Sequence, residues 1–307
     1  EDADGFAAKL TIGEGNVFDG CISAYNADDG WDLFAKVETG SIGKVTIKNS
    51  VAFRNGYLFD DDGNMIKAGN GNGFKMGGAN LSGHHVLINS ISFGNKAKSI
   101  DSNSCPDIEA YNSTSFENGA SNVAFYTSSS ANKNTAFAAE GIISYAKENV
   151  NSENLSPLGT QDTSKYLGAT NYYYTGSGYA NSEGTLVQDD WFKDLDLNAY
   201  LAAGIVKQAD GRYTIGNLTR NEDGTINMNG FLELTEKAPA DAGARMTGTP
   251  SAVIEVRETV EPADYTALDA AFEKAAKLLN EIDYSESDYE PAKTAYDRLD
   301  ALYQQAV

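Results

Sequence analysis

The densest group of acidic side chains in the chain is the segment Asn26-Ala-Asp-Asp-Gly-Trp-Asp32. Its three carboxylates, Asp28, Asp29 and Asp32, would repel one another strongly if they lay close together without a cation between them. Oxygen ligands at this density are typical of Ca²⁺, which takes roughly six to eight of them, and not of zinc. Asp-Asp-Gly is also a common turn, so the segment alone is compatible with a calcium site and with a solvated acidic turn.

A second unusual segment is Gly71-Asn-Gly-Phe-Lys-Met-Gly-Gly78, in which glycines surround Lys75. A surface lysine usually stands among helix-forming residues, so this setting marks Lys75 as a candidate functional residue. A lysine that packs along the surface is the alternative.

An internal repeat of about 23 residues predicts the scaffold that positions these segments. The segment 49–55, with the sequence Asn-Ser-Val-Ala-Phe-Arg-Asn, recurs in related form at 89–95 and 112–118, and 134–137 is a degraded fourth copy. Asn26 and Asn49 are 23 residues apart, as are the first asparagines of the second and third copies. Leucine-rich repeats have a similar period, but their Leu-x-x-Leu-x-Leu pattern is absent.

A unit this short cannot bury its own apolar face, so successive units must stack as the coils of a solenoid. Three short strands and three turns fit one coil. We therefore predict an all-β fold, a parallel β-helix. The repeated asparagines would hydrogen-bond to one another along the axis, and Phe53, Phe93 and Phe116 would stack in the core.

The repeat also relates Asp4 and Lys75 to the acidic segment. Asp4 precedes Asp28 by 24 residues, so the two should lie on adjacent coils about 4.8 Å apart and bring four carboxylates together. Measured back from the repeat asparagine, Lys75 lies 14 residues before it and Asp32 lies 17. We expect Lys75 one coil later and three positions along, on the order of 10 Å from the carboxylates, with room for one sugar ring.

The interval from Asn49 to Asn89 is 40 residues, and the excess lies around Gly56–Gly73. Long loops on repeat scaffolds tend to carry function. The stretch 60–64 resembles the start of an EF-hand loop but lacks the later ligands, so we expect a solvated turn there. His84 and His85 open a strand, which should direct one inward and one outward, and neither is expected to be catalytic.

Composition narrows the class of partner. The chain has 307 residues and a net charge of −21, which argues against nucleic acid and anionic membranes as partners. No apolar run approaches the roughly 20 residues of a membrane span, so no membrane insertion is expected. An acidic polymer would be repelled unless a cation mediates.

The three motifs together resemble the family 9 polysaccharide lyases over roughly residues 1–245. Members of this family carry Asp-Gly-Phe-Ala, Asn-x-Asp-Asp-Gly-Trp-Asp and Gly-Asn-Gly-Phe-Lys-x-Gly-Gly in that order, which stand here at 4–7, 26–32 and 71–78. The resemblance implies a right-handed parallel β-helix that uses Ca²⁺ to cleave acidic polysaccharides such as pectate. Family catalytic domains continue upstream of the first motif, so the early coils and their cap are expected to be missing here.

The resemblance also implies roles for individual residues. Asp4, Asp28, Asp29 and Asp32 match the calcium ligands and Lys75 the catalytic base. The implied reaction is β-elimination, in which calcium pairs with the C6 carboxylate and a neutral lysine takes the C5 proton. The pKa of Lys75 must then fall well below its usual value, which predicts an alkaline pH optimum. Trp31 is the ring best suited to stack on a sugar.

The C-terminal part of the chain has a different composition. We divide the chain into a β-helix lyase domain with flanking β segments (1–245), a linker (246–262) and a helical module (263–307). The last stretch has apolar residues at helical spacing and resembles modules of Gram-positive cell-surface proteins.

These features predict a secreted or wall-associated lyase for pectate or polygalacturonate, monomeric within a larger modular protein. One alternative is a lyase for another uronate polymer, such as rhamnogalacturonan. Another is a carbohydrate-binding β-helix without catalysis.

Overall fold

The computed structural model describes residues 3–60, 62, 64–128, 135–156, 162–202, 205–207, 213–215 and 218–246. The chain divides into two compact units, Glu1–Ile254 and Glu255–Val307. All described residues belong to the first unit. The predicted helical module at 263–307, and the predicted linker beyond Met246, lie outside them.

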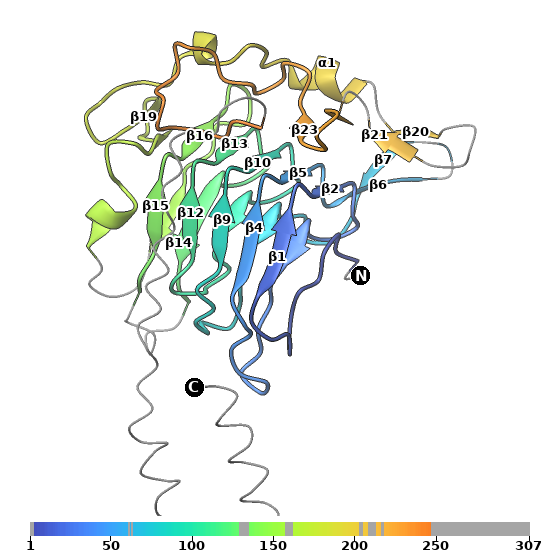
Figure 1. Ribbon diagram of the computed structural model, residues 1–307, viewed down its shortest axis with the longest axis vertical. Helices are drawn as coiled ribbons and strands as arrows, with labels where there is room; N and C mark the ends of the chain where they lie inside the picture. The colour runs from blue at the N-terminus through green and yellow to red at the C-terminus, as the bar shows by residue number, and fades with distance from the viewer. Residues whose placement is uncertain are drawn as a thin grey trace, which may run out of the picture. The chain divides into compact units, whose positions relative to one another are not determined.

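Three parallel five-stranded sheets wind along one axis and form a parallel β-helix, which confirms the predicted fold class (Figure 1). Sheet A consists of β3 (Trp31–Asp32), β8 (Phe74–Lys75), β11 (Ile100–Asp101), β14 (Val123–Tyr126) and β17 (Asn154–Ser156). Sheet B consists of β1 (Asn16–Asp19), β4 (Val45–Lys48), β9 (Val86–Ile88), β12 (Glu109–Tyr111) and β15 (Ala138–Glu140). Sheet C consists of β2 (Ile22–Ala24), β5 (Val51–Phe53), β10 (Ile91–Phe93), β13 (Thr114–Phe116) and β16 (Ile143–Tyr145).

The predicted asparagine ladder forms at the last asparagine of each copy, whereas among the first asparagines only Asn89 donates to Asn49, at 2.8 Å, and Asn112 donates to the carbonyl oxygen of Asp241 instead. In the buried ladder the side-chain amides of Asn26, Asn55 and Asn95 each donate to the next asparagine, ending at Asn118, over 2.8, 2.9 and 2.9 Å. The spacing of 23 residues had predicted that Asn26 pairs with Asn49, but Asn26 pairs with Asn55. The coil that joins them is longer than the repeat, so equal spacing did not mean equal position.

The aromatic column on sheet C lies on a different side of the sheet from the one we predicted. Phe53, Phe93 and Phe116 are in register, and the first two rings stack at 4.8 Å. They point away from the solenoid interior, which is filled on this sheet by the small side chain of Ala52 and its counterparts. The fourth member of the column is Tyr145, in register with Phe116, so the degraded copy at 134–137 was misaligned.

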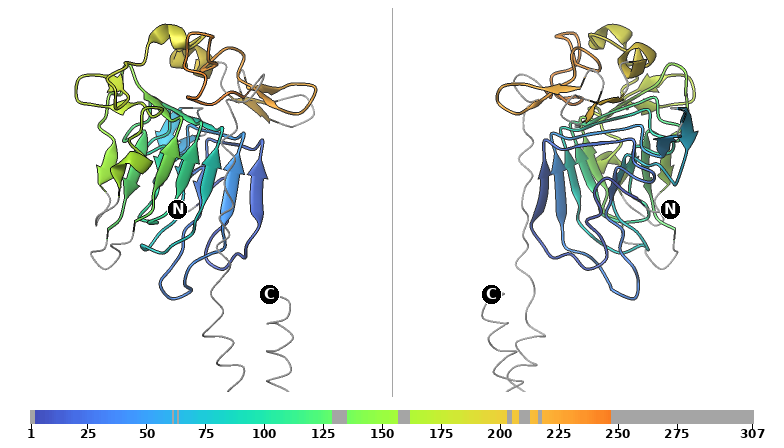
Figure 2. Two further views of the ribbon diagram at one scale, coloured as in Figure 1. Left: turned by 60° about the vertical axis from the view of Figure 1, so that its left-hand side comes forward. Right: turned by 90° about the vertical axis from the view of Figure 1, so that its right-hand side faces the viewer.

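The segment 162–246 buries this column, as expected for a flanking region (Figures 1 and 2). From Tyr179 onward it contributes a second apolar core over sheet C, in which Tyr200 and Phe231 contact Phe93 at ring distances of 5.7 and 5.0 Å, whereas Tyr166 packs in the solenoid interior. Its elements are short: η1 (Thr163–Lys165), β18 (Tyr173–Tyr174), β19 (Tyr179–Ala180), η2 (Asp189–Trp191), α1 (Leu197–Ala202), β20 (Ile205–Lys207), β21 (Tyr213–Ile215), β22 (Thr219–Arg220) and β23 (Ile226–Asn227).

The insertion in the repeat forms an antiparallel hairpin, β6 (Tyr57–Phe59) and β7 (Met65–Lys67). Asp60 caps its turn by accepting hydrogen bonds from the backbone N–H groups of Asp62 and Asn64 at 3.1 and 2.7 Å. The acidic stretch thus makes a turn, as expected. In the described part of the chain, no helix is long and apolar enough to cross a bilayer.

Candidate active site

The three sequence motifs occupy one position in three successive coils. Each carries a glycine followed by an aromatic residue: Gly5-Phe6, Gly30-Trp31 and Gly73-Phe74. Phe6 pairs with Trp31, Trp31 pairs with Phe74, and both ring pairs lie 4.8 Å apart. The rings form a buried column that holds the coils in phase. Trp31 is fully buried, so the prediction that it stacks on a sugar was wrong.

The glycines let the coils approach at this point. A Cβ atom on Gly30 would lie 2.5 Å from the carbonyl oxygen of Gly73 and 2.7 Å from the side-chain amide of Asn55. Any larger residue would push the two coils apart. The close approach brings the polar residues beside the glycines within contact distance across coils.

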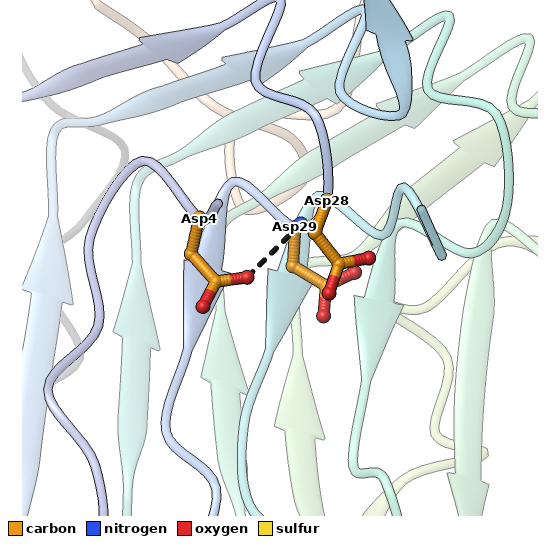
Figure 3. Close-up of side chains that lie close together, drawn as sticks. All are labelled: Asp4, Asp28 and Asp29. Carbon is orange, nitrogen blue, oxygen red and sulfur yellow. Dashed lines mark hydrogen bonds between the residues drawn. The ribbon is translucent and has the colours of Figure 1, made fainter. Parts of the chain in front are cut away.

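Carboxylates from two coils converge beside this column (Figure 3). Asp4, Asp28 and Asp29 each offer a carboxylate oxygen, and the three oxygens lie within 4.8 Å of one another. The backbone N–H of Asp29 donates to Asp4 Oδ1 at 3.2 Å, which fixes the two coils together. The predicted meeting of Asp4 with the acidic segment is confirmed, and all three carboxylates are largely buried.

The return arm of the inserted hairpin, residues 68–72, supports the carboxylates from the next coil. The backbone N–H of Asn70 donates to Asp28 Oδ1. The backbone and side-chain N–H groups of Asn72 both donate to Asp29 Oδ1, at 2.7 and 2.8 Å. Lys96 holds the arm in turn, because its ammonium group donates to the carbonyl oxygens of residues 68 and 69. The insertion therefore orients the acidic cluster.

Lys75 contacts the cluster directly. Its Nζ atom lies 2.9 Å from Asp29 Oδ2 and 3.2 Å from Asp32 Oδ1. The expected separation on the order of 10 Å was wrong, because Lys75 and Asp32 are in register on adjacent strands. The three-residue difference in spacing is absorbed by the turn 33–44, which is longer than its counterpart at 76–84.

The pKa values at this contact reflect burial and charge together. Burial lowers the pKa of Lys75, but the carboxylates of Asp29 and Asp32 outweigh it and raise the pKa above its usual value. The sequence-based expectation of a depressed pKa therefore fails for the protein alone. Burial raises the pKa of Asp29 to about 6, against the opposing effects of Lys75 and Asn72.

Lys9 belongs to the cluster although the sequence motifs did not single it out. Its Nζ atom lies 2.7 Å from Asp4 Oδ2 and 2.7 Å from Asp32 Oδ2, so it links two coils. Lys9 precedes Asp32 by 23 residues, the repeat length, and that spacing is a signal that sequence reasoning could have used. Four carboxylates and the ammonium groups of Lys9 and Lys75 leave a net charge of −2 at the cluster.

A cleft of about 370 Å³ opens onto this cluster. A larger hollow of about 550 Å³ lies beside α1, where Phe116 and Glu117 form part of its wall. We assign the site to the smaller cleft because it joins carboxylates with lysines, including Lys75, whose Nζ also lies 5.7 Å from the ring centre of Phe34. Its lining residues are Lys9, Leu10, Asp28, Asp32, Phe34, Lys36, Asn70 and Lys75.

The two histidines point in opposite directions, as alternation predicted. His84 is exposed, whereas His85 is 1% exposed and its Nδ1 accepts a hydrogen bond from the backbone N–H of Val45 at 3.1 Å. Burial lowers the pKa of His85 to about 4, so the ring is neutral at physiological pH. Neither residue lines the cleft.

Comparisons with known proteins agree with the parallel β-helix fold. Residues 1–136 match the family model described as Pel9A-like, right handed beta helix region. The chain is 37% identical over 262 residues to "Pectate lyase L" of Paenibacillus polymyxa (strain SC2), covering 84% of this chain and 48% of that protein. The crystal structure of pectate lyase Pel9A superposes with a TM-score of 0.52 at 28% identity, over 77% of this chain and 48% of that one.

A solved structure titled "Rhamnogalacturonan lyase" also superposes, with a TM-score of 0.51 at 20% identity, over 79% of this chain and 55% of that one. At this identity the likeness concerns the fold alone. The fold is thus a right-handed parallel β-helix, similar to that of Pel9A. The chain spans about half the length of the Paenibacillus protein and of the Pel9A chain.

Proposed function

We propose that this chain carries the active site of a calcium-dependent pectate lyase, which cleaves polygalacturonate by β-elimination. One observation carries the proposal: Lys75 contacts Asp29 and Asp32 at the edge of a cluster of converging carboxylates, and Lys75, Asp28 and Asp32 line one cleft. The similarity to proteins named pectate lyase supports the choice of substrate.

The acidic cluster fits a calcium ion. Asp4, Asp28 and Asp29 supply hard oxygen donors within 4.8 Å of one another. Asp32 is joined to this group because Lys9 forms ion pairs with both Asp32 and Asp4. We assign these four aspartates as the calcium ligands. Bound calcium would pair with the C6 carboxylate of the substrate and make the C5 proton easier to remove.

Lys75 is the base in this mechanism. Its neutral amine takes the C5 proton, the C4–C5 double bond forms, and the bond from C4 to the glycosidic oxygen breaks. The departing oxygen takes up a proton, which water can donate. The carboxylates that raise the pKa of Lys75 would share their charge with the metal, so this pKa falls on loading. Because only the neutral amine reacts, we expect the rate to rise towards alkaline pH.

The experiment compares the unmodified protein with Lys75→Ala and with Lys48→Ala, a control on sheet B whose lysine pairs with Asp19. Each protein is incubated with polygalacturonate and either Ca²⁺ or EDTA, and the ultraviolet absorbance of the unsaturated product is followed. We expect a calcium-dependent rise that Lys75→Ala slows by about 10²- to 10⁴-fold and the control leaves unchanged.

Calorimetric titration with Ca²⁺ separates the remaining outcomes. Calcium binding without product from polygalacturonate would favour another uronate polymer, such as rhamnogalacturonan, which is tried next. A protein that binds oligogalacturonates but eliminates none of these polymers would be a carbohydrate-binding β-helix. No calcium binding would contradict the ligand assignment.

A further inference from the structure

The outer face of sheet A continues beyond the acidic cluster with a second arrangement of charged residues. Asp32, Lys75 and Asp101 are in register on β3, β8 and β11. The residues that precede them on each strand, such as Ile100 on β11, are buried in the solenoid interior. The three charged side chains therefore form one outward column, with Asp101 one coil beyond Lys75.

Lys98 is held beside this column. Its Nζ atom lies 3.0 Å from Asp101 Oδ2, donates to the hydroxyl oxygen of Tyr126 at 3.1 Å, and lies 4.7 Å from the centre of the Tyr126 ring. Asp101 is in turn fixed by the backbone N–H of Asn103, which donates to Oδ1 at 3.0 Å. An ammonium group has three N–H donors, so these contacts leave one for a ligand.

Lys98 is held in place by a buried carboxylate and is itself still accessible to solvent. Asp101 is 1% exposed, and burial raises its pKa. A buried carboxylate is costly unless a partner compensates it, and Lys98 is that partner. The side chain of Lys98 is 28% exposed, so its ammonium group can still be reached from solvent.

The charge pattern indicates the ligand. The chain carries a net charge of −21, yet Lys9, Lys36 and Lys75 line one cleft and Lys98 lies one coil beyond it. Lysines gathered along the coils suit a polymer that carries a carboxylate on each successive residue. The coil step is about 4.8 Å, which is of the order of the length of one sugar residue.

We propose that Lys98, oriented by Asp101 and Tyr126, binds the carboxylate of the uronate next to the one that reacts at Lys75. Lys98 then selects for a polyuronate chain and does not take part in the proton transfer. This inference rests on the proposed function, because it names a substrate contact of the same site.

Steady-state rates of Lys98→Met and of the matched control Lys48→Met test the proposal, with long polygalacturonate and with digalacturonate in calcium. For the polymer we expect Lys98→Met to raise KM by about tenfold with kcat within about twofold, because the lost contact is made equally in ground and transition states. In digalacturonate the only neighbour of the reacting uronate is the leaving residue, so with Lys98 on the side away from the cleaved bond its position stays empty, and this substrate should show a smaller change in KM. Lys48→Met should behave as the unmodified protein.

Two further variants separate charge and orientation from structure. Lys98→Arg keeps the positive charge and should restore most of the affinity for the polymer. Tyr126→Phe keeps the ring and removes the hydroxyl acceptor, so it should raise KM by less than Lys98→Met. Added salt should raise KM less steeply in Lys98→Met than in the unmodified protein, since one ionic contact is gone.

Clear results would overturn the proposal. It is wrong if Lys98→Met matches Lys48→Met in KM for the polymer, or if kcat falls equally on both substrates with KM unchanged. If the unmodified protein forms no unsaturated product, the proposed function fails, but calorimetry with tetragalacturonate still tests Lys98. In that case equal affinities of the unmodified protein and Lys98→Met would reject the contact.

Discussion

The outer faces of sheets A and C are built from the same coils and carry opposite kinds of side chain. On sheet A the outward residues of successive strands are Asp32, Lys75 and Asp101, and they line or adjoin an open cleft. On sheet C the outward residues include Phe53 and Phe93, which are buried under the segment 162–246. Strand alternation is the same on both sheets, so the difference lies in what covers each face.

This contrast separates the roles of the two faces. The solenoid is held together by its apolar interior and its buried asparagine ladder, so its outer faces are free to differ. Sheet C uses its outer face to gain a second apolar core, whereas sheet A leaves its outer face open and fills it with charges that compensate one another. Changes on sheet C should therefore alter stability with the site intact, and changes on sheet A should alter binding and rate with the fold intact.

The largest effect on stability is expected for Phe93→Ala. Phe93 is fully buried, stacks on Phe53 at 4.8 Å and contacts two rings of the covering segment. Removing it leaves a cavity that the packed rings cannot fill, so we expect the free energy of unfolding to fall by about 3–5 kcal/mol. Denaturant titration measures this change, and calorimetry should show an unaltered Kd for Ca²⁺.

Phe59→Ala serves as the control, since Phe59 is 43% exposed on the inserted hairpin. It should cost far less stability than Phe93→Ala. A large loss of calcium affinity in Phe93→Ala would break the comparison, because it would mean that the covered face supports the site as well as the fold.

The solenoid could be predicted because the sequence repeat is regular. The side of sheet C on which the aromatic column lies could not be predicted from the sequence. The copies read Val-Ala-Phe, Ile-Ser-Phe and Thr-Ser-Phe, with a small residue alternating with a large one. Alternation shows that Ala52 and Phe53 face opposite sides without showing which side is the interior. The cover that buries Phe93 comes from residues such as Phe231, more than a hundred positions later, with no local signal in the copies.

The site could be predicted in part for a similar reason. Equal coil lengths would place residues by counting, and Asp4 and Asp28 obey that rule. Lys75 does not, because the turn 33–44 is three residues longer than its counterpart, and turns tolerate such changes without moving the strands. The contact with Asp32 therefore needed the strand register, which the sequence does not show.

The next largest effect is the pH dependence of stability that arises from the buried residue His85. The folded protein holds the pKa of His85 at about 4, by burial and by the charge of His84 against the opposing effect of Asp107, whereas the unfolded chain has the usual 6.5. Below pH 6.5 the unfolded state takes up a proton that the folded state does not. Stability is therefore lost as pH falls from 6.5 to about 4, by about 3 kcal/mol in total from this residue.

His85→Asn tests this expectation, because Asn can still accept the hydrogen bond from the backbone N–H of Val45. Denaturant titrations between pH 7 and 4 should show a smaller loss of stability in this variant than in the unmodified protein. The matched control is His84→Asn, at the exposed neighbour; because burial and not the charge of His84 is the largest cause of the low pKa of His85, its pH dependence should change far less than that of His85→Asn. Equal slopes for all three proteins would show that His85 is not the titrating group.

The smallest effect is expected for the removal of Lys9, which should change the affinity of the acidic cluster for calcium. Its ammonium group lies 2.7 Å from both Asp4 and Asp32, so a cation that uses these two carboxylates must displace it. Lys9→Met removes the competitor and one positive charge, so we expect the Kd for Ca²⁺ to fall by about tenfold, or about 1.4 kcal/mol. Calorimetric titration measures the change, and calcium should raise the Tm of Lys9→Met more than that of the unmodified protein.

Lys36→Met provides the control for this prediction. Lys36 lines the same cleft and makes no ion pair with a carboxylate among the described residues. Its loss changes the charge of the cleft by the same amount, so any effect common to both variants reflects the general field, and only the excess in Lys9→Met reports direct competition. Weaker calcium binding in Lys9→Met would mean the opposite: that Lys9 draws Asp4 and Asp32 together into the arrangement that the metal needs.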